Sequence, residues 1–183
     1  MGIPGVGKTT VVDKVLSKVR GSKLVTFGSV MLEEAKRMKW VKHRDELRKL
    51  PVDKQKGLQW RAATKISRMK EGTVVVDTHL FVRTDEGFWP GLPFEVVRAL
   101  KPTHLVLVEA SPEEIASRRA ADAQRYRDAV SKEGLAEEMA LARGFLTVAS
   151  TLTGAPMMIV TNREGKAGEA AGLIARALRK AVA

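Results

Sequence analysis

The first residues of the chain have the types and spacing that bind a nucleotide phosphate. Residues 2–9 read Gly-Ile-Pro-Gly-Val-Gly-Lys-Thr and match G-x-x-x-x-G-K-[S/T] at every fixed position. Glycines in such a loop let backbone N–H groups turn towards an anion, and the positive end of the following helix faces the same point. We expect Lys8 to reach the β- and γ-phosphates of ATP and the Thr9 hydroxyl to ligate Mg²⁺. We call residues 2–9 the phosphate-binding loop.

An acidic residue follows the apolar run 74–76. Asp77 stands at the carboxyl end of this expected strand, where an acid that holds Mg²⁺ or its water would lie. Many strands end in aspartate, so the assignment of Asp77 to a Mg²⁺ site depends on the phosphate-binding loop in the same chain. His79 is expected either to contact a substrate or to cap the turn after the strand. His43 and His104 are isolated, so the sequence suggests no His-rich metal site.

A spread of arginines supplies positive charge further along the chain: Arg83, Arg118, Arg119, Arg125, Arg127 and Arg143. Phosphoryl transfer needs cations around the moving group, and the planar guanidinium offers bidentate donors for it. A solvated basic helix face is the alternative for any one of them. As a group downstream of a phosphate-binding loop, they favour a mobile arginine lid.

Alternating strands and helices must position these residues. Four short, nearly continuous apolar runs predict buried parallel strands at 23–27, 73–76, 105–108 and 157–160. Helical patterns lie between them at about 8–19, 30–38, 52–69, 113–127, 135–152 and 169–182. This rhythm predicts an α/β, doubly wound fold in one domain. Residues 84–102 are rich in glycine and proline and are expected to be largely loop and turn.

A phosphate-binding loop ordinarily follows a strand, and only Met1 precedes Gly2. We therefore expect the first strand of the fold to be missing from this sequence, and the native chain to start earlier.

The composition of the chain excludes several classes of protein. The 183 residues include no cysteine, which excludes a disulfide scaffold, a cysteine zinc site and a cysteine nucleophile. No apolar run approaches the roughly 20 residues that span a bilayer, and no signal-peptide pattern opens the chain, so we expect a cytoplasmic protein without a membrane partner. The formal net charge of +11 indicates anionic partners but no particular reaction.

With these motifs the chain resembles the archaeal adenylate kinases over nearly its whole length. The resemblance is carried by 2–10 (GIPGVGKTT), 27–28 (FG), 43–51 (HRDELRKLP), 76–79 (VDTH), 83–84 (RT), 90–93 (PGLP), 152–155 (LTGA) and 162–165 (NREG). The block 44–51 and the element 77–79 are far more specific than the loop alone.

The resemblance implies a three-layer P-loop NTPase fold, an AMP-binding region at about 28–60, a short lid at about 118–132 and the reaction Mg·ATP + AMP ⇌ 2 ADP. It implies a catalytic set of Lys8, Arg83, Arg118, Arg125 and Arg127. The implied ATP-binding residues are Gly2, Ile3, Pro4, Gly5, Val6, Gly7, Lys8, Thr9, Thr10, Arg119 and Asn162. The implied AMP-binding residues are Gly28, Arg44, Arg48, His79 and Arg83, and the implied Mg²⁺ residues are Thr9 and Asp77.

The resemblance also implies a homotrimer. The chain departs from the family pattern at Tyr126, where a basic residue is common, and at 141–145, where an Asn-Arg pair is expected and Arg143 would stand in for its arginine. Positioning and charge carry this chemistry, so no nucleophile or general base is required.

Two other functions stay open. The first is a kinase for another nucleoside monophosphate, because composition does not identify the base. The second is an RNA-associated P-loop ATPase, which the positive charge supports. The chain has no recognisable RNA-recognition module and only three tryptophans, five phenylalanines and one tyrosine for stacking. The charge permits RNA binding, but the sequence does not predict it.

Overall fold

The computed structural model describes residues 1–70, 72–84, 86–121 and 131–180. In chain order the elements are α1 (Lys8–Leu16), β1 (Ser22–Thr26), α2 (Phe27–Arg37), the 3₁₀ helix η1 (Arg44–Lys49), α3 (Val52–Ser67), β2 (Thr73–Asp77), β3 (Phe81–Thr84), β4 (Gly87–Pro90), α4 (Phe94–Leu100), β5 (Leu105–Glu109), α5 (Pro112–Ala121), α6 (Lys132–Thr153), β6 (Met157–Thr161) and α7 (Ala167–Lys180).

The strands expected from the apolar runs all form, each within one residue of its predicted bounds. β1 runs parallel to β2, with Leu24 opposite Val75, and β5 runs parallel to β6, with Leu107 opposite Ile159. Parallel neighbours need crossover connections, and helices supply them. The prediction of an α/β fold with parallel strands is confirmed.

Met1 pairs with β5 in the manner of a strand residue. Its amino group donates to the Val106 carbonyl at 2.8 Å, and the Val108 N–H donates to the Met1 carbonyl at 2.8 Å. Met1 thus bonds to the residues on either side of Leu107, as a residue does in a parallel pair of strands. The pairing places the phosphate-binding loop, which starts at the next residue, at the carboxyl end of β5.

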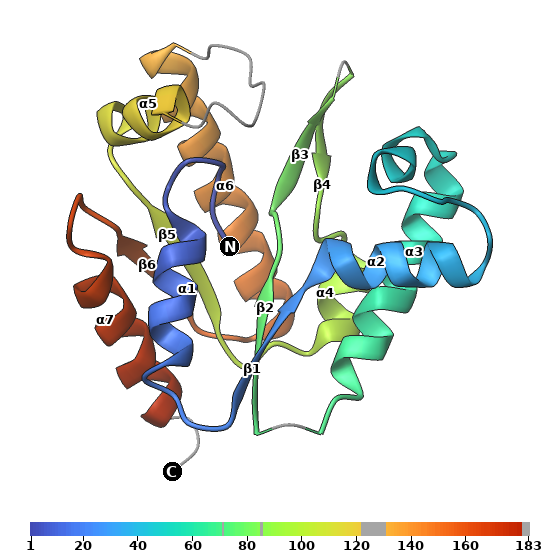
Figure 1. Cartoon of the computed structure of the whole chain (residues 1–183), viewed down its shortest axis with the longest axis horizontal. Helices are drawn as coiled ribbons and strands as arrows, with labels where there is room; N and C mark the ends of the chain where they lie inside the picture. Colours follow the sequence, from blue (N-terminus) through green and yellow to red (C-terminus); the bar gives the residue numbers. More distant parts are fainter. Residues whose placement is uncertain (71, 85, 122–130, 181–183) are drawn as a thin grey trace.

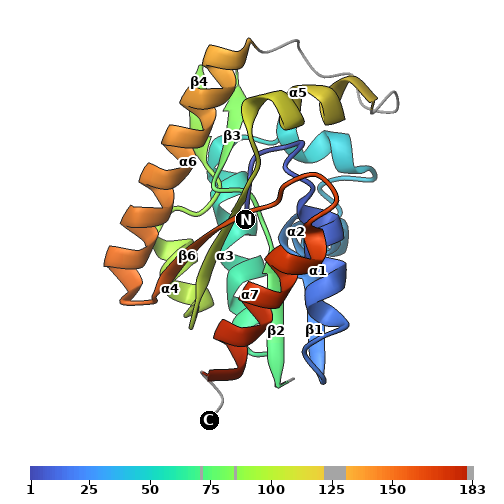
Figure 2. The ribbon, with the colours of Figure 1, turned by 90° about the vertical axis from the view of Figure 1, so that its left-hand side faces the viewer.

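Helices cover the strands on two sides (Figure 2). α1 packs against α7 on one side, and α6 packs against β5 and β6 on the other. The main core between them is built from small and branched side chains, and Val11, Ile115 and Leu146 have no exposed surface. This core lies directly under the phosphate-binding loop, since Ile3 and Val6 of the loop belong to it.

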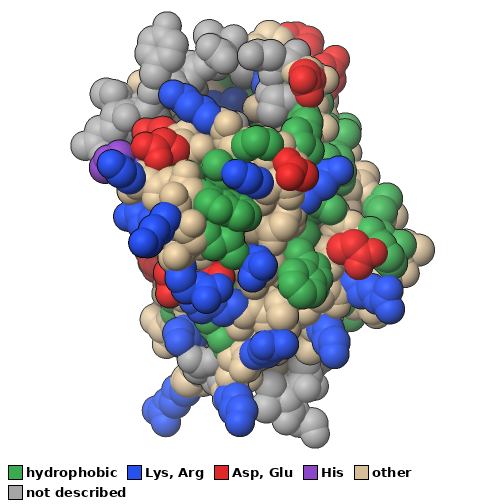
Figure 3. Space-filling model, turned by 90° about the vertical axis from the view of Figure 1, so that its right-hand side faces the viewer, with side chains coloured by type: hydrophobic (Ala, Val, Ile, Leu, Met, Phe, Trp, Pro, Cys, Tyr) green, Lys and Arg blue, Asp and Glu red, His purple; other side chains and the backbone are tan. Residues whose placement is uncertain are grey.

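A second group of helices, α2, α3 and α4, packs beside β1 and β2 (Figure 1). Its separate core contains Phe27, Val30, Ala62, Ile66 and Val96. On the outer face of this part, Lys and Arg side chains spread around a cluster of hydrophobic ones (Figure 3). Positive charge on this face is therefore exposed to solvent.

The expectation that 84–102 is largely loop and turn is wrong. β3 and β4 form an antiparallel hairpin, with Val82 opposite Trp89, and α4 follows it. The glycines and prolines mark the ends of these elements instead of excluding them. Gly87 has φ +115° beside the hairpin turn, Pro90 ends β4, and Pro93 precedes the first residue of α4.

In 1–70, 72–84, 86–121 and 131–180, no helix combines the length and the apolarity that a membrane span requires.

Candidate active site

The phosphate-binding loop needs its glycines for two different reasons. Gly5 and Gly7 have φ of +94° and +76°, a left-handed conformation that other residues rarely adopt. Gly2 has no positive φ, but a Cβ there would lie 2.6 Å from the Val108 carbonyl oxygen. The loop can therefore lie against β5 and turn directly into α1, whose first residue is Lys8.

Side chains from distant parts of the chain hold the carbonyl oxygens of this loop. The Val6 carbonyl accepts hydrogen bonds from Asn162 Nδ2 at 2.8 Å and from Arg118 Nη1 at 3.2 Å. The Pro4 carbonyl accepts one from Arg119 Nε at 3.0 Å. With these oxygens taken up by donors outside the loop, its N–H groups are the ones left to meet an anion.

Lys8 forms an ion pair with Asp77 at the carboxyl end of β2. Both side chains are largely buried, and the next residue, Thr9, is exposed at the first turn of α1. A carboxylate and a hydroxyl are hard oxygen ligands, and Mg²⁺ usually takes only one or two such protein ligands beside phosphates and water. The described part of the chain contains no group of three or more His, Asp or Glu that could hold a metal. Thr9 and Asp77 thus fit a nucleotide-bound Mg²⁺ and not a closed protein site.

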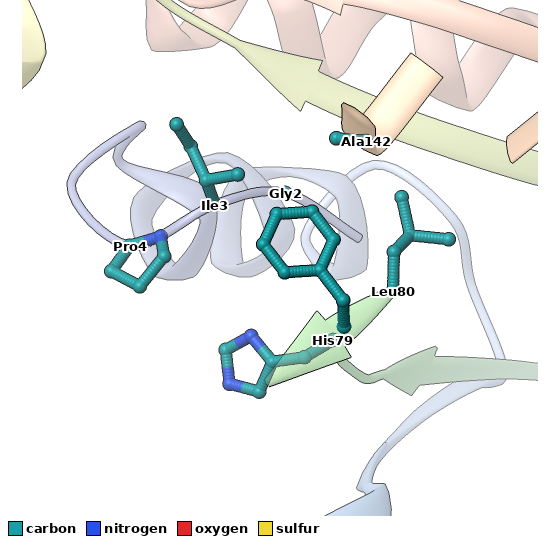
Figure 4. Close-up of a pocket in the computed structure, with 7 residues that line it drawn as sticks. Gly2, Ile3, Pro4, His79, Leu80 and Ala142 are labelled. Atoms are coloured by element: carbon teal, nitrogen blue, oxygen red, sulfur yellow. The ribbon is translucent and has the colours of Figure 1, made fainter. Parts of the chain in front are cut away.

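A small pocket separates the loop from the end of β2 (Figure 4). Gly2 and Pro4 line it on the loop side, His79 and Leu80 on the strand side, and Ala142 from α6. The His79 ring reaches solvent, yet desolvation in this recess, followed by the Lys8 ammonium, lowers its pKa. The direction of this shift favours the neutral imidazole, which can both donate and accept a hydrogen bond.

The arginines predicted to surround the phosphates are held in different ways. Arg118 donates to the Asn162 carbonyl at 3.2 Å and to Glu164 Oε2 at 2.9 Å, besides its bond to the loop. Arg119 donates to Glu138 Oε2 at 3.1 Å, and Arg83 donates to Glu138 Oε1 at 3.5 Å. The structure therefore places Arg118 and Arg119 on the loop, and it links Arg83 to Arg119 through Glu138.

Two residues of the expected AMP side also meet. A Cβ at Gly28 would lie 2.9 Å from Arg44 Nη2, so the Arg44 guanidinium covers the backbone at the start of α2. Arg48 lies in η1, and nothing further is described of its side chain. Arg125 and Arg127 lie outside the described residues, as does most of the expected lid.

A family model described as an AAA domain matches residues 1–136. The adenylate kinase of Thermoplasma acidophilum is 44% identical over 170 residues, which cover 93% of this chain and 91% of that protein. The adenylate kinase of Methanocaldococcus jannaschii is 44% identical over 169 residues, 90% of this chain and 88% of that protein. The adenylate kinase of Pyrococcus horikoshii is 42% identical over 172 residues, which cover 93% of this chain and 88% of that protein.

The chain belongs to the adenylate kinase family. Both the expected kinase class and the expected P-loop fold are confirmed.

Two residues singled out from the sequence, Asn162 and Arg143, have surroundings that the sequence did not predict. Asn162, expected to bind ATP, is 4% exposed and lies under the phosphate-binding loop, with its N–H bonded to the Glu109 carbonyl. Its Oδ1 is buried and has no hydrogen-bond partner among the described residues. Arg143, the expected stand-in, donates to both carboxylate oxygens of the buried Glu109 at 2.8 and 2.6 Å. This pairing raises the pKa of Arg143.

Sequence reasoning missed the two buried carboxylates of this adenylate kinase site, Glu109 and Glu138. Glu109 ends β5, as Asp77 ends β2, and this shared position is a signal in the sequence. Glu138 follows Leu135 by three positions and precedes Ala142 by four, and both neighbours are buried. Helical spacing therefore assigns Glu138 to the inner face of α6, while Glu137 is exposed.

Proposed function

We propose that the chain transfers the γ-phosphoryl group of ATP to AMP and so forms two ADP. The observation that carries this proposal is the Lys8–Asp77 ion pair at the mouth of the phosphate-binding loop. It brings one cation and one hard anion to the point where a triphosphate and its metal would enter. The printed name of the relatives, adenylate kinase, supplies the donor and the acceptor.

On the donor side, the loop N–H groups bind the phosphates and Lys8 exchanges Asp77 for the β- and γ-phosphate oxygens. Asp77, once released, and the Thr9 hydroxyl would hold Mg²⁺, which neutralises phosphate charge when bound. Thr10 completes this donor side at the start of α1. No proton has to be removed by a dedicated base, because positioning and electrostatic stabilisation carry the transfer.

On the acceptor side, we assign AMP binding to Gly28, Arg44, Arg48, His79 and Arg83. Arg44 lies over the backbone of Gly28, so these two residues form one side of the acceptor site. The Arg83 side chain is 59% exposed and can exchange Glu138 for a phosphate. Arg125 and Arg127 would complete the charge around the transferring group, and Arg118 would add its positive charge while it stays bonded to the Val6 carbonyl.

The test is ADP formation from Mg·ATP with AMP, CMP, UMP and GMP as separate acceptors, with and without EDTA. Turnover with AMP that EDTA abolishes is the expected result. Turnover with another acceptor but not AMP would identify a kinase for that monophosphate. ATP hydrolysis without any acceptor, together with salt-dependent RNA binding, would identify the RNA-associated ATPase.

We propose a homotrimer as the assembly. Exposed apolar side chains occur on α6 and on β6, which pack together: Val148, Leu152, Met157 and Ile159. Exposed apolar side chains on neighbouring elements are typical of subunit contacts. Light scattering on the purified protein should give three times the chain mass of 20.0 kDa, whereas a monomer mass would reject the trimer. We propose a cytoplasmic location because ATP and AMP are available there; cell fractionation tests it.

A further inference from the structure

The carboxylate of Glu138 joins two arginines that belong to opposite sides of the site. Glu138 lies on the inner face of α6, with 9% of its side chain exposed. Its Oε2 accepts a hydrogen bond from Arg119 on α5 at 3.1 Å, and its Oε1 accepts one from Arg83 on β3 at 3.5 Å. A single side chain of α6 therefore connects α5 with the β3 strand, 55 residues earlier in the sequence.

The Arg119–Glu138 pair is more buried and shorter than the Arg83–Glu138 pair. Arg119 is only 12% exposed and is bonded at a second point, the Pro4 carbonyl of the phosphate-binding loop. A buried carboxylate requires a well-ordered partner, and the Arg119 pair supplies it. Arg83 is 59% exposed, its bond to Glu138 is long, and its guanidinium also lies 5.4 Å from the centre of the Phe88 ring. Arg119 thus fixes the carboxylate, and the carboxylate orients Arg83.

We propose that Glu138 is a positioning residue that sets Arg83 for the acceptor phosphate and links its placement to the phosphate-binding loop through Arg119. This inference rests on the proposed function, in which Arg83 binds the phosphate of AMP. An exposed arginine held near its bound position loses less rotamer freedom when the phosphate arrives. When the phosphate arrives, it replaces the long Glu138 bond, and the pair of Glu138 with Arg119 remains.

The experiment compares the KM values for AMP and ATP in the full chain and in E138Q. The neutral amide keeps the size of the side chain but removes the charge that holds two guanidinium groups. The KM for AMP should rise about five- to tenfold, since one rotamer-rich side chain must now be ordered on binding. The KM for ATP should stay within about twofold, because Arg119 keeps its bond to Pro4. The matched control is E137Q, which makes the same change at the exposed neighbour and should leave both KM values unchanged.

A double-mutant cycle with Arg119→Lys separates positioning from a general loss of stability. Lys cannot donate to Pro4 and Glu138 at once with the geometry of a guanidinium. R119K should therefore raise the KM for AMP in the wild-type background and add little to it in the E138Q background. Additive effects on this KM would overturn the link.

Other outcomes are equally decisive. An unchanged or lower KM for AMP in folded E138Q would overturn the proposal, because the carboxylate would then merely compete with the phosphate. If E138Q does not fold, E138D carries the test: it retains the charge and the Arg119 pair but is one methylene too short to reach Arg83. Its KM for AMP should also rise, and a wild-type value would refute the role. Failure of the wild-type chain to use AMP would reject the proposed function itself.

Discussion

The substitution Gly2→Ala tests how closely the phosphate-binding loop must lie against β5. A Cβ at Gly2 would lie 2.6 Å from the Val108 carbonyl oxygen and 2.9 Å from a Val6 methyl group. Ordinary contacts begin at 3.4 Å, so relieving the carbonyl contact requires a shift of about 0.8 Å, the difference between these two distances. The two hydrogen bonds of Met1 to β5 oppose that shift directly beside the substituted residue.

A displacement near 1 Å in a positioning element can lower the rate about 100-fold. We therefore expect kcat for ADP formation in Gly2→Ala to fall about 100-fold, and the free energy of unfolding to fall by about 1–3 kcal/mol as in other overpacked sites. A coupled ADP assay at saturating ATP and AMP, with chemical denaturation, measures both. Gly168→Ala is the control, since a Cβ there meets nothing within 4 Å. A folded Gly2→Ala protein with the wild-type kcat would refute the steric reasoning.

Three further predictions use other parts of the molecule. Lys8→Ala should lower kcat at least about 100-fold by removing a cation at the phosphates, while the exposed Lys14→Ala on the same helix keeps full activity in the same assay. Gly57→Ala in α3 should raise the free energy of unfolding by about 0.5–1 kcal/mol, because the added Cβ meets no atom; a loss of stability in urea would contradict this. Hydrogen bonding to Arg37 lowers the pKa of the buried Glu34 below its ordinary value of 4.5, so the stabilisation from Glu34 is present above pH 4.5 and is lost as the pH falls through the lowered pKa. Unfolding measured at pH 6.5 and pH 4 should show a smaller acid loss in Glu34→Gln than in the wild type, and equal losses would reject the role of Glu34.

The strands could be predicted because their signals are local. A strand in a parallel sheet is a short run of Val and Leu, as in the half-buried β2 and the buried β5, and the run itself marks the bounds. The β3–β4 hairpin and α4 were missed because their glycines and prolines carry the opposite local signal. The pairing of the two strands, with Arg83 opposite Phe88 and Thr84 opposite Gly87, shows that Gly87 lies beside a hairpin turn.

The residues of the site likewise differ in whether a local sequence signal predicts them. The phosphate-binding loop is contiguous, so its motif, its glycine conformations and the start of α1 all follow from eight adjacent residues. What holds the loop does not follow, because Asn162, Arg118 and Arg119 approach it from more than 100 residues away. A sequence motif can indicate that Arg118 is near phosphate chemistry without distinguishing a phosphate ligand from a support of the loop.

That distinction bears on how the arginines act. Arg118 has acceptors in the Val6 carbonyl, the Asn162 carbonyl and Glu164, and Arg119 has the Pro4 carbonyl and Glu138. If either guanidinium left these partners for a phosphate, the carbonyl groups that shape the loop would lose donors at the moment the loop must hold ATP. Arg83 has one long bond to a carboxylate and a largely exposed side chain, so it can change partner at the least cost. The geometry therefore favours a division of labour in which Arg118 and Arg119 keep the loop in shape and Arg83 meets the incoming acceptor.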